Sequence, residues 1–233
     1  MDSTNNVQPK QDSARNHHAT RISPAPKKSP MEPISPQNPV PLPDSMPVMV
    51  LSDCYLFPGC FLPLFIFEER YRAMLRHALA GNRMFCIGTR TDENEDSVLP
   101  WSTAGLIRAC VRQPDGTSHL MLYGVQRIRL SGWEQEHPFR IASISPVEVT
   151  PPPADAAQAL IQESLSLLPA PTPTCSEAMQ QLKSTLAAMS CPDRVCDVLA
   201  YHFVREPEAL KTLLSSTDPL ERLRVLNAEL RRL

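Results

Sequence analysis

The chain has 233 residues, of which 21% are charged and 42% are hydrophobic, and its formal net charge is −2. These values are typical of a soluble globular protein of one or two domains, and they exclude a chain of extreme composition. The longest apolar stretch, Met46 to Phe67, is broken by an aspartate, a glycine and prolines, which favours a protein core over a membrane span. Because residues 1–20 lack the apolar segment of a secretory signal peptide, we expect a cytoplasmic protein with no membrane partner.

The seven cysteines are an odd number, and no two of them form a C-x-x-C pair. A chain of this length does not depend on crosslinks to fold, so we expect free and mostly buried thiols. Cys54 and Cys60 flank a Phe-Pro-Gly turn, but no histidine lies near them in the sequence to lower a thiol pKa. We therefore predict no catalytic residue, no metal site and no cofactor.

Proline and glycine divide the chain into three parts. Residues 1–45 hold nine prolines and no aromatic residue, a composition that cannot bury enough apolar surface to fold, so we expect a disordered tail. All seven glycines lie in the middle of the chain; since glycine serves tight turns and weakens helices, a β-rich domain is predicted over residues 46–150. A run of three prolines then acts as a hinge before a glycine-free helical subdomain, residues 151–233.

The predicted β domain contains one helix. Residues 68–80 carry apolar side chains at i, i+3, i+4, i+7 and i+8 and are followed by Gly81, which predicts an amphipathic helix and its end. Short or alternating apolar runs predict strands around it, over residues 84–89, 104–112, 119–123, 125–130 and 139–144.

The sequence also predicts a turn between two of these strands and the face that one strand turns to the core. Gln113 to Thr117, with the sequence QPDGT, predicts a tight hairpin turn, because proline favours its first corner and glycine the left-handed position that follows. In the strand before it, period two predicts that Ile107, Ala109 and Val111 share one face. Several short strands and one helix indicate a small barrel-like sheet.

The last part of the chain is predicted to form a bundle of amphipathic helices. Asp218 to Glu221, with the sequence DPLE, has the pattern of a capping box with proline at the first helical position. Three apolar stripes at helical spacing support the helices; they are Met179, Leu182, Leu186 and Met189, then Val195, Val198, Leu199, His202 and Phe203, then Leu220, Leu223, Leu226, Leu230 and Leu233.

Motifs that carry chemistry are missing from the sequence. It contains no G-x-x-x-x-G-K-[ST], G-x-G-x-x-G, H-E-x-x-H or G-x-S-x-G, so phosphate-binding loops, helical zinc sites and nucleophile elbows have no support. Arginines recur in the predicted strands and would form a basic face for RNA if they shared one exposed side, the alternative being an ordinary solvated face. They are Arg108, Arg112, Arg127, Arg129 and Arg140.

Several motifs together resemble the amino-terminal domain of the Lon protease family. In chain order they are Pro47-Val48-Met49-Val50-Leu51, Phe57-Pro58-Gly59, Leu62-Pro63-Leu64-Phe65-Ile66-Phe67-Glu68, Pro114-Asp115-Gly116-Thr117 and Tyr123-Gly124-Val125-Gln126-Arg127. The resemblance is specific over Met46 to Val149 and looser through the helices to Leu233. It implies an α+β fold, a PUA-like β pseudo-barrel followed by a helical subdomain.

The resemblance also implies a function. In the full-length family the chain continues into an ATPase module and a serine–lysine protease domain, whereas this sequence stops at Leu233, so we expect neither ATP hydrolysis nor proteolysis. The family's role for this domain implies a non-catalytic module that binds unfolded or degron-bearing polypeptide, as an adaptor for a protease or chaperone partner. An RNA-binding PUA-like module is the alternative, and the oligomeric state is open.

A candidate binding site lies near the Phe-Pro-Gly turn. Phe57, Phe61 and Leu62 are expected to line an apolar groove for extended hydrophobic segments, because the aromatic density there exceeds what a small barrel can bury. The alternative is that all three side chains belong to the core.

Overall fold

The structure is a computed structural model that describes residues 40–92, 97–169, 176–187, 189 and 191–233. Most of the predicted tail, residues 1–39, lies outside the described residues. Val40–Leu233 forms one compact unit. Within it, Val40 and Leu42, near the end of the predicted tail, are half-buried against the barrel core.

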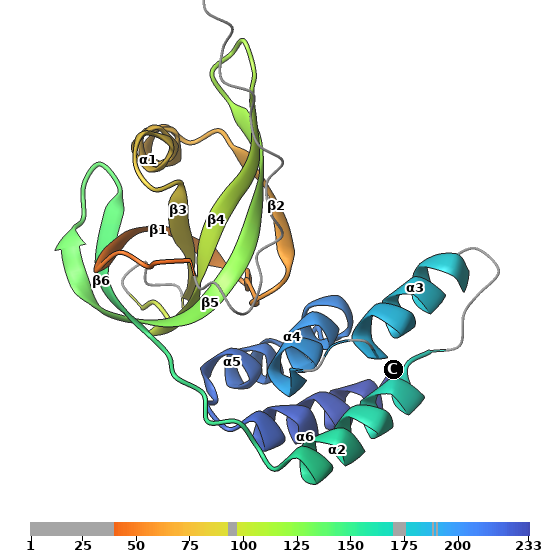
Figure 1. Ribbon diagram of the computed structural model, residues 1–233. Coiled ribbons are helices and arrows are strands. Elements are labelled where there is room, and N and C mark those ends of the chain that lie inside the picture. Colours follow the sequence, from red (N-terminus) through yellow and green to blue (C-terminus); the bar gives the residue numbers. More distant parts are fainter. Residues whose placement is uncertain (1–39, 93–96, 170–175, 188, 190) are drawn as a thin grey trace, which may run out of the picture. The chain divides into compact units, whose positions relative to one another are not determined.

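Six strands form the first part of this unit (Figure 1). They are β1 (Ser45–Ser52), β2 (Phe61–Ile66), β3 (Met84–Arg90), β4 (Trp101–Arg112), β5 (Ser118–Gln135) and β6 (Arg140–Pro146). The strand order is β2-β5-β4-β3-β1-β6, and β6 also pairs with β5, which closes the sheet into a pseudo-barrel. β1 and β3 are parallel, whereas the other pairs are antiparallel.

The length of β5 leaves one strand outside the closed ring. The first part of β5, from Ser118 to Tyr123, pairs with β2, whereas its second part, from Ile128 to Gln135, pairs with β6. β2 is therefore an edge strand, held by β5 on one side only.

The helix α1 (Glu69–Ala80) agrees with the predicted amphipathic helix. Its apolar stripe enters a core cluster with side chains of β1, β3, β4 and β5, and Gly81 follows its last turn. The Tyr71 hydroxyl donates a hydrogen bond to the carbonyl oxygen of Val50 at 2.7 Å, which joins the helix to β1. The buried residues of the stripe are Tyr71, Met74, Leu75 and Ala78.

The β4–β5 hairpin confirms one prediction and corrects another. The Thr117 carbonyl oxygen accepts from the Gln113 amide at 2.8 Å, and Gly116 has a φ of +84°, as the predicted turn requires. The predicted strand face is wrong, because Ile107 is buried while Val111 is 60% exposed. A register shift between Ile107 and Ala109 inserts an extra residue and turns the following side chains to the opposite face.

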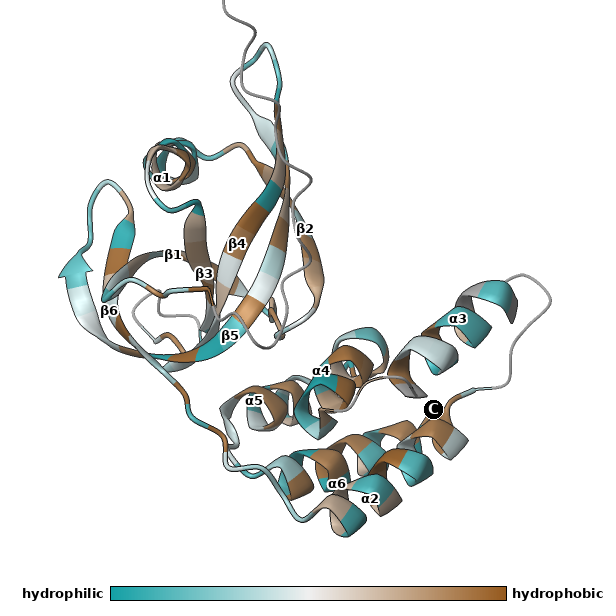
Figure 2. Ribbon diagram, in the orientation of Figure 1, coloured by the Kyte–Doolittle hydropathy of each residue, from teal (hydrophilic) through white to brown (hydrophobic). Residues whose placement is uncertain are grey.

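Five helices make up the rest of the described chain. They are α2 (Ala154–Leu167), α3 (Ser176–Ala187), α4 (Pro192–Phe203), α5 (Pro207–Ser215) and α6 (Pro219–Leu230). Figure 2 shows hydrophilic and hydrophobic residues interleaved along α2 and α6, as amphipathic packing requires. Their apolar sides meet in a core cluster that includes Ile161, Leu199, Leu213 and Leu226.

The start of α6 follows only half of the predicted capping box. Asp218 Oδ1 accepts from the Leu220 amide at 2.9 Å, which satisfies one of the unpaired amides of the first turn. Glu221 does not reach back to the Asp218 amide. Instead, the Ser216 hydroxyl donates to Glu221 and itself accepts from the Asp218 amide at 3.2 Å. Ser216 therefore relays the second contact of the box.

The segment between β1 and β2 packs with the helices. Tyr55, Phe57 and Cys60 belong to the same core cluster as the helical leucines. Gly59, with a φ of +84°, donates its amide to the carbonyl oxygen of Gly124 at 2.8 Å, which anchors the Phe-Pro-Gly turn on β5. The turn is therefore the part of the barrel that the helices cover.

Candidate functional site

The largest exposed apolar side chains of the barrel gather around β2. The exposure of the side chains alternates along this strand. Phe61 and Phe65 are 48% and 47% exposed, whereas Ile66, which follows Phe65, is fully buried. Phe67, directly after the strand, is 59% exposed. The alternation follows from the pleat of a strand, which turns successive side chains to opposite faces. One face of β2 lies in the core and the other lies open.

Neighbouring strands extend this open face. β5 places Tyr123 opposite Phe61 and His119 opposite Phe65, with ring centroids 4.9 Å and 4.7 Å apart. β4 then places Val111 opposite His119. Cross-strand neighbours of this kind lie on the same face of a sheet. We define the aromatic surface as Phe61, Pro63, Phe65, Phe67, Val111 and His119.

The aromatic surface is hollowed and carries no acidic, lysine or arginine side chain. A shallow depression of about 380 Å³ lies between Pro63, Phe65, His119 and Met121. Figure 2 shows β2 coloured mainly as hydrophobic. Contiguous exposed apolar surface of this kind is uncommon on a soluble protein and marks an interaction site for another apolar group.

The structure separates the three residues predicted to line the groove. Phe57 is fully buried in the core shared with the helices, so it cannot contact a partner at the surface. Leu62 points inward and is half-buried against the barrel core. Phe61 alone lies on the aromatic surface. Sequence reasoning missed Phe65 and Phe67, although one signal was available. Every position from 61 to 67 is apolar, so both faces of the strand are apolar. Because a strand on one side of a core needs only one apolar face, the second face was a candidate for an exposed apolar surface.

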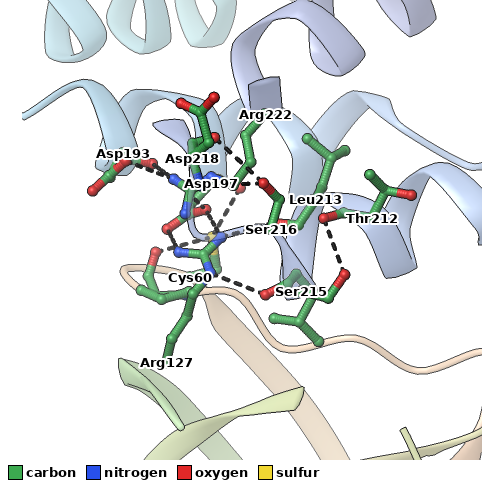
Figure 3. Close-up of polar contacts among 12 residues, drawn as sticks. Cys60, Arg127, Asp193, Asp197, Thr212, Leu213, Ser215, Ser216, Asp218 and Arg222 are labelled. Atoms are coloured by element: carbon green, nitrogen blue, oxygen red, sulfur yellow. Dashed lines mark hydrogen bonds and ion pairs between the residues drawn. The ribbon is translucent and has the colours of Figure 1, made fainter. Parts of the chain in front are cut away.

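A second notable feature is a buried ion pair between the barrel and the helices (Figure 3). The two guanidinium Nη atoms of Arg127, on β5, donate to the two carboxylate oxygens of Asp197, on α4, at 2.8 Å and 2.5 Å. The same guanidinium donates to the carbonyl oxygens of Leu213 and Leu214 at 3.0 Å and 3.2 Å, at the end of α5. Arg127 therefore satisfies carbonyls that a helix terminus leaves unpaired.

A second arginine completes this cluster. Arg222, on α6, is fully buried and donates to Asp193 Oδ1 at 2.8 Å, while its Nη2 lies 3.7 Å from Asp197 Oδ1. Burial alone would lower the pKa of Arg127, but the Asp197 carboxylate outweighs it and the pKa lies above its ordinary value. For the carboxyl group of Asp193 burial acts in the other direction and raises the pKa, although the nearby charge of Arg222 lowers it in part. Two cations and two carboxylates balance, as expected for a structural contact.

The arginines do not form the common exposed face that an RNA-binding module would need. Arg127 is 5% exposed and is engaged by Asp197. Arg129 lies over the ring of Trp101 and Arg140 over the ring of Trp133. Arg112 and Arg129 are exposed, Arg108 and Arg140 are half-buried and Arg127 is buried, so the five arginines do not all lie on one exposed face. The structure does not support the RNA-binding alternative.

Burial shields four of the described thiols from chemistry, whereas Cys110 is half-buried and Cys191 is exposed. Desolvation raises the pKa of Cys60, Cys86 and Cys196 to about 12 and that of Cys54 to about 11. They are therefore protonated at neutral pH and are weak nucleophiles. Within the described residues, no group of three or more histidine, cysteine, aspartate or glutamate side chains is placed to hold a metal ion. No described helix has both the length and the apolar character needed to cross a membrane.

Comparisons with known proteins agree with this architecture. A family model described as the substrate-binding domain of ATP-dependent protease La (LON) matches residues 45–232. The chain is 24% identical over 204 residues to the Lon protease of Desulfovibrio desulfuricans, covering 82% of this chain and 22% of that protein. It is 26% identical over 195 residues to the Lon protease of Roseiflexus castenholzii, covering 78% and 23%. The chain thus spans less than a quarter of the length of these relatives.

Two solved structures share the fold. One is the N-terminal domain of a Mycobacterium avium complex Lon protease, with a TM-score of 0.65 and 18% identity, covering 80% of this chain and 97% of that one. The other is a Lon N-terminal domain protein from Xanthomonas campestris, with a TM-score of 0.55 and 22% identity, covering 79% and 97%. They match the predicted fold, a β pseudo-barrel with a C-terminal helical part.

Proposed function

Because the chain belongs to the Lon substrate-binding domain family, we propose that it binds unfolded or degron-bearing polypeptide through the aromatic surface, as a non-catalytic adaptor. The family supports a substrate-recognition module. The observation that carries the choice of site is the row of exposed rings Phe61, Phe65 and Phe67 along one edge strand. Folded proteins bury such side chains, whereas unfolded ones expose them, so an apolar surface distinguishes the two states of a client.

The energetics of the surface suit this role. Each aromatic side chain that becomes buried against a client contributes roughly 1.5–3 kcal/mol before the cost of ordering the client is subtracted. Because Phe61, Phe65 and Phe67 are already about half buried, each gains only about half of this amount, and the other residues of the aromatic surface must contribute to reach micromolar affinity. A surface without charged side chains adds no electrostatic selectivity, so clients of differing sequence are accepted.

The test is fluorescence anisotropy with a labelled polypeptide kept unfolded by reduction and carboxymethylation of its cysteines. We expect saturable binding to the full chain that persists at moderate salt. The double variant Phe65→Ser/Phe67→Ser should bind at least about tenfold more weakly, because it removes two anchors of the surface. Leu233→Ser is the matched control, since Leu233 is also exposed, at 68%, and lies outside the aromatic surface.

The outcomes separate the possible functions. Equal affinities of the parent and the double variant would contradict the assignment to this surface. Binding of labelled single-stranded RNA that weakens steeply with salt, without binding of the polypeptide, would instead favour the RNA-binding alternative.

The adaptor part of the proposal has a separate readout. Adding the chain to a full-length Lon protease should lower the KM for degradation of an unfolded client, because the adaptor supplies an additional site for capture. The Phe65→Ser/Phe67→Ser variant should not do so. Degradation that is indifferent to the added chain would contradict the adaptor role and leave the binding activity as a separate result.

A further inference from the structure

We propose that the aromatic surface recognises its client through side chains alone, and that the open edge of β2 is closed to strand addition. This inference rests on the proposed function and specifies how the same surface reads its ligand. An edge strand ordinarily offers unpaired amides and carbonyls to an incoming strand, and many peptide-binding domains use them. The geometry of β2 points to the opposite arrangement.

The register of β2 determines which of its backbone groups face the free edge. The Gly124 amide donates to the carbonyl oxygen of Cys60 at 2.9 Å, so Cys60 directs its carbonyl toward β5. Backbone groups alternate sides along an antiparallel strand. Leu62, Leu64 and Ile66 therefore face β5, and Phe61, Pro63 and Phe65 direct their backbone groups to the free edge. These same three residues have exposed side chains.

Two of the three edge positions each lack one of the two backbone groups that an added strand would use. Pro63 has no amide hydrogen, so it cannot donate to an added strand. The carbonyl oxygen of Phe61 already accepts from the Tyr201 hydroxyl, on α4, at 2.7 Å. Phe65 alone has both an amide and a carbonyl that neither proline nor Tyr201 blocks. An added strand would find both groups at only one of the three positions, too few for the consecutive pairs of hydrogen bonds that hold an antiparallel strand.

The side chains at these positions remain accessible to a partner. Phe61 and Phe65 are about half exposed, and the depression beside Pro63 and His119 has the volume of a small ligand cleft. The lack of charged groups on the surface fits a neutral apolar occupant. The client is therefore a polypeptide segment that presents aromatic and aliphatic side chains, and its chain direction, amide hydrogens and backbone chirality are not read. Closing the edge also protects a strand with so many exposed rings from pairing with its own copies.

The experiment compares two probes with the same side chains. One is a labelled L-peptide of alternating phenylalanine and leucine flanked by polar residues. The other is the matching peptoid, an N-substituted glycine oligomer with benzyl and isobutyl groups in the same order, which has no amide hydrogens in its apolar part. A peptoid with methoxyethyl groups is the control for non-specific binding. Affinities of both probes for the full chain are measured by fluorescence anisotropy.

We expect the peptide and the benzyl peptoid to bind with dissociation constants within about fivefold of each other. A peptoid that binds more than about fivefold more weakly than the L-peptide would show that backbone pairing contributes, and would overturn this inference while leaving the proposed function intact. If neither probe binds, the proposed function fails and this inference fails with it.

The variant Pro63→Val/Tyr201→Phe provides a second test on the protein side. It restores an amide at position 63 and releases the Phe61 carbonyl, and both changes lie at residues that are not fully buried. We expect the variant to strengthen binding of the L-peptide relative to the peptoid. An unchanged ratio of the two affinities would contradict the claim that Pro63 and Tyr201 close the edge. Circular dichroism checks that the variant keeps the parent fold.

Discussion

Phe57 and Phe61 lie four residues apart in the same apolar stretch, yet one is fully buried and the other is half exposed. The segment that contains Phe57 lies beneath the helices and shares their core. The outer face of β2 leaves Phe61 and Phe65 about half exposed, and α4 reaches only the edge of the strand, through the Tyr201 hydroxyl. The difference shows that apolar composition alone does not identify a core. A neighbouring element must cover the residues, and the helices cover only one of these two regions.

The two regions also differ in their electrostatics. The covered region holds the Arg127–Asp197 pair, whose bidentate geometry permits only one arrangement of barrel and helices. The aromatic surface has no such directional contact and suits partners that vary. The covered region thus holds the barrel and the helices together, and the open one is the proposed binding surface. Four predictions test this contrast, and their expected effects decrease in order.

The largest effect is expected at the buried ion pair. Asp197→Ala leaves the Arg127 guanidinium in the interior without its counter-charge, so the free energy of unfolding should fall by about 3–5 kcal/mol. Urea denaturation followed by circular dichroism measures the loss. The double variant Arg127→Met/Asp197→Leu removes both charges and should recover part of the loss, because the carbonyl oxygens of Leu213 and Leu214 still lose their donor. A single variant as stable as the parent would show that this pair does not hold the covered region together.

The next effect is expected at the contact between the Phe-Pro-Gly turn and β5. A Cβ atom added at Gly124 would lie 2.1 Å from the carbonyl oxygen of Phe57, and a backbone atom cannot move aside easily. Gly124→Ala should therefore lower the free energy of unfolding by about 1–3 kcal/mol. Ser131→Ala, at an exposed position of the same strand, is the control and should change little. Comparable values for the two variants would argue against close packing at the turn.

A smaller effect is expected at alkaline pH. Burial raises the pKa of Cys60 and Cys196 to about 12, from an ordinary value of 9.0. Between these values the unfolded chain releases thiol protons that the folded chain keeps, so stability is fully present below pH 9 and falls as the pH rises toward 12. At pH 10 the loss should be roughly 1 kcal/mol for each thiol.

Urea denaturation at pH 8 and pH 10 measures this dependence. The difference between the two pH values should shrink in Cys196→Ala, which removes one of the four buried thiols whose pKa is raised. If the parent and the variant lose the same stability between these pH values, the buried thiol is not responsible for the pH dependence.

The smallest effect is expected on the aromatic surface. Phe67→Ser should change the free energy of unfolding by no more than about 0.5 kcal/mol, because Phe67 is 59% exposed and lies outside the core clusters. Phe57→Ala, in the covered region, should cost about 3–5 kcal/mol in the same assay. The two phenylalanines thus provide a direct comparison of the regions. Similar losses would mean that the aromatic surface contributes to the core.

Local features of the fold were predictable from the sequence. The turn at Gln113 to Thr117, the helix α1 and the start of α6 at Asp218 all depend on residues within a few positions of one another. Glycine at a left-handed position and an aspartate cap act through local sterics and hydrogen bonds, so their signals are visible in a short segment. The β-rich middle and the helical end followed from the same local preferences.

The candidate site was predictable only in part. The sequence located the aromatic density and included Phe61, but it also selected Phe57 and Leu62. From 61 to 67 both faces of the strand are apolar, so period two does not tell the inner face from the outer one. The alternating pattern also led to a wrong expectation for Arg127. A charged residue in an alternating strand is expected to face water, but Arg127 is buried because Asp197, distant in the sequence, neutralises it.

By itself, the sequence determined the turn at Gln113 to Thr117, the helix α1 and the start of α6, because these depend on neighbours along the chain. Only the tertiary structure decided which apolar face stays open and which arginine is buried. Both depend on residues far apart in the sequence: Asp197 lies 70 positions from Arg127, and Tyr201 lies 140 positions from Phe61. Coverage by a distant element and neutralisation by a distant charge leave no mark on the local sequence pattern. For this reason the sequence alone does not tell the buried core from the exposed aromatic surface.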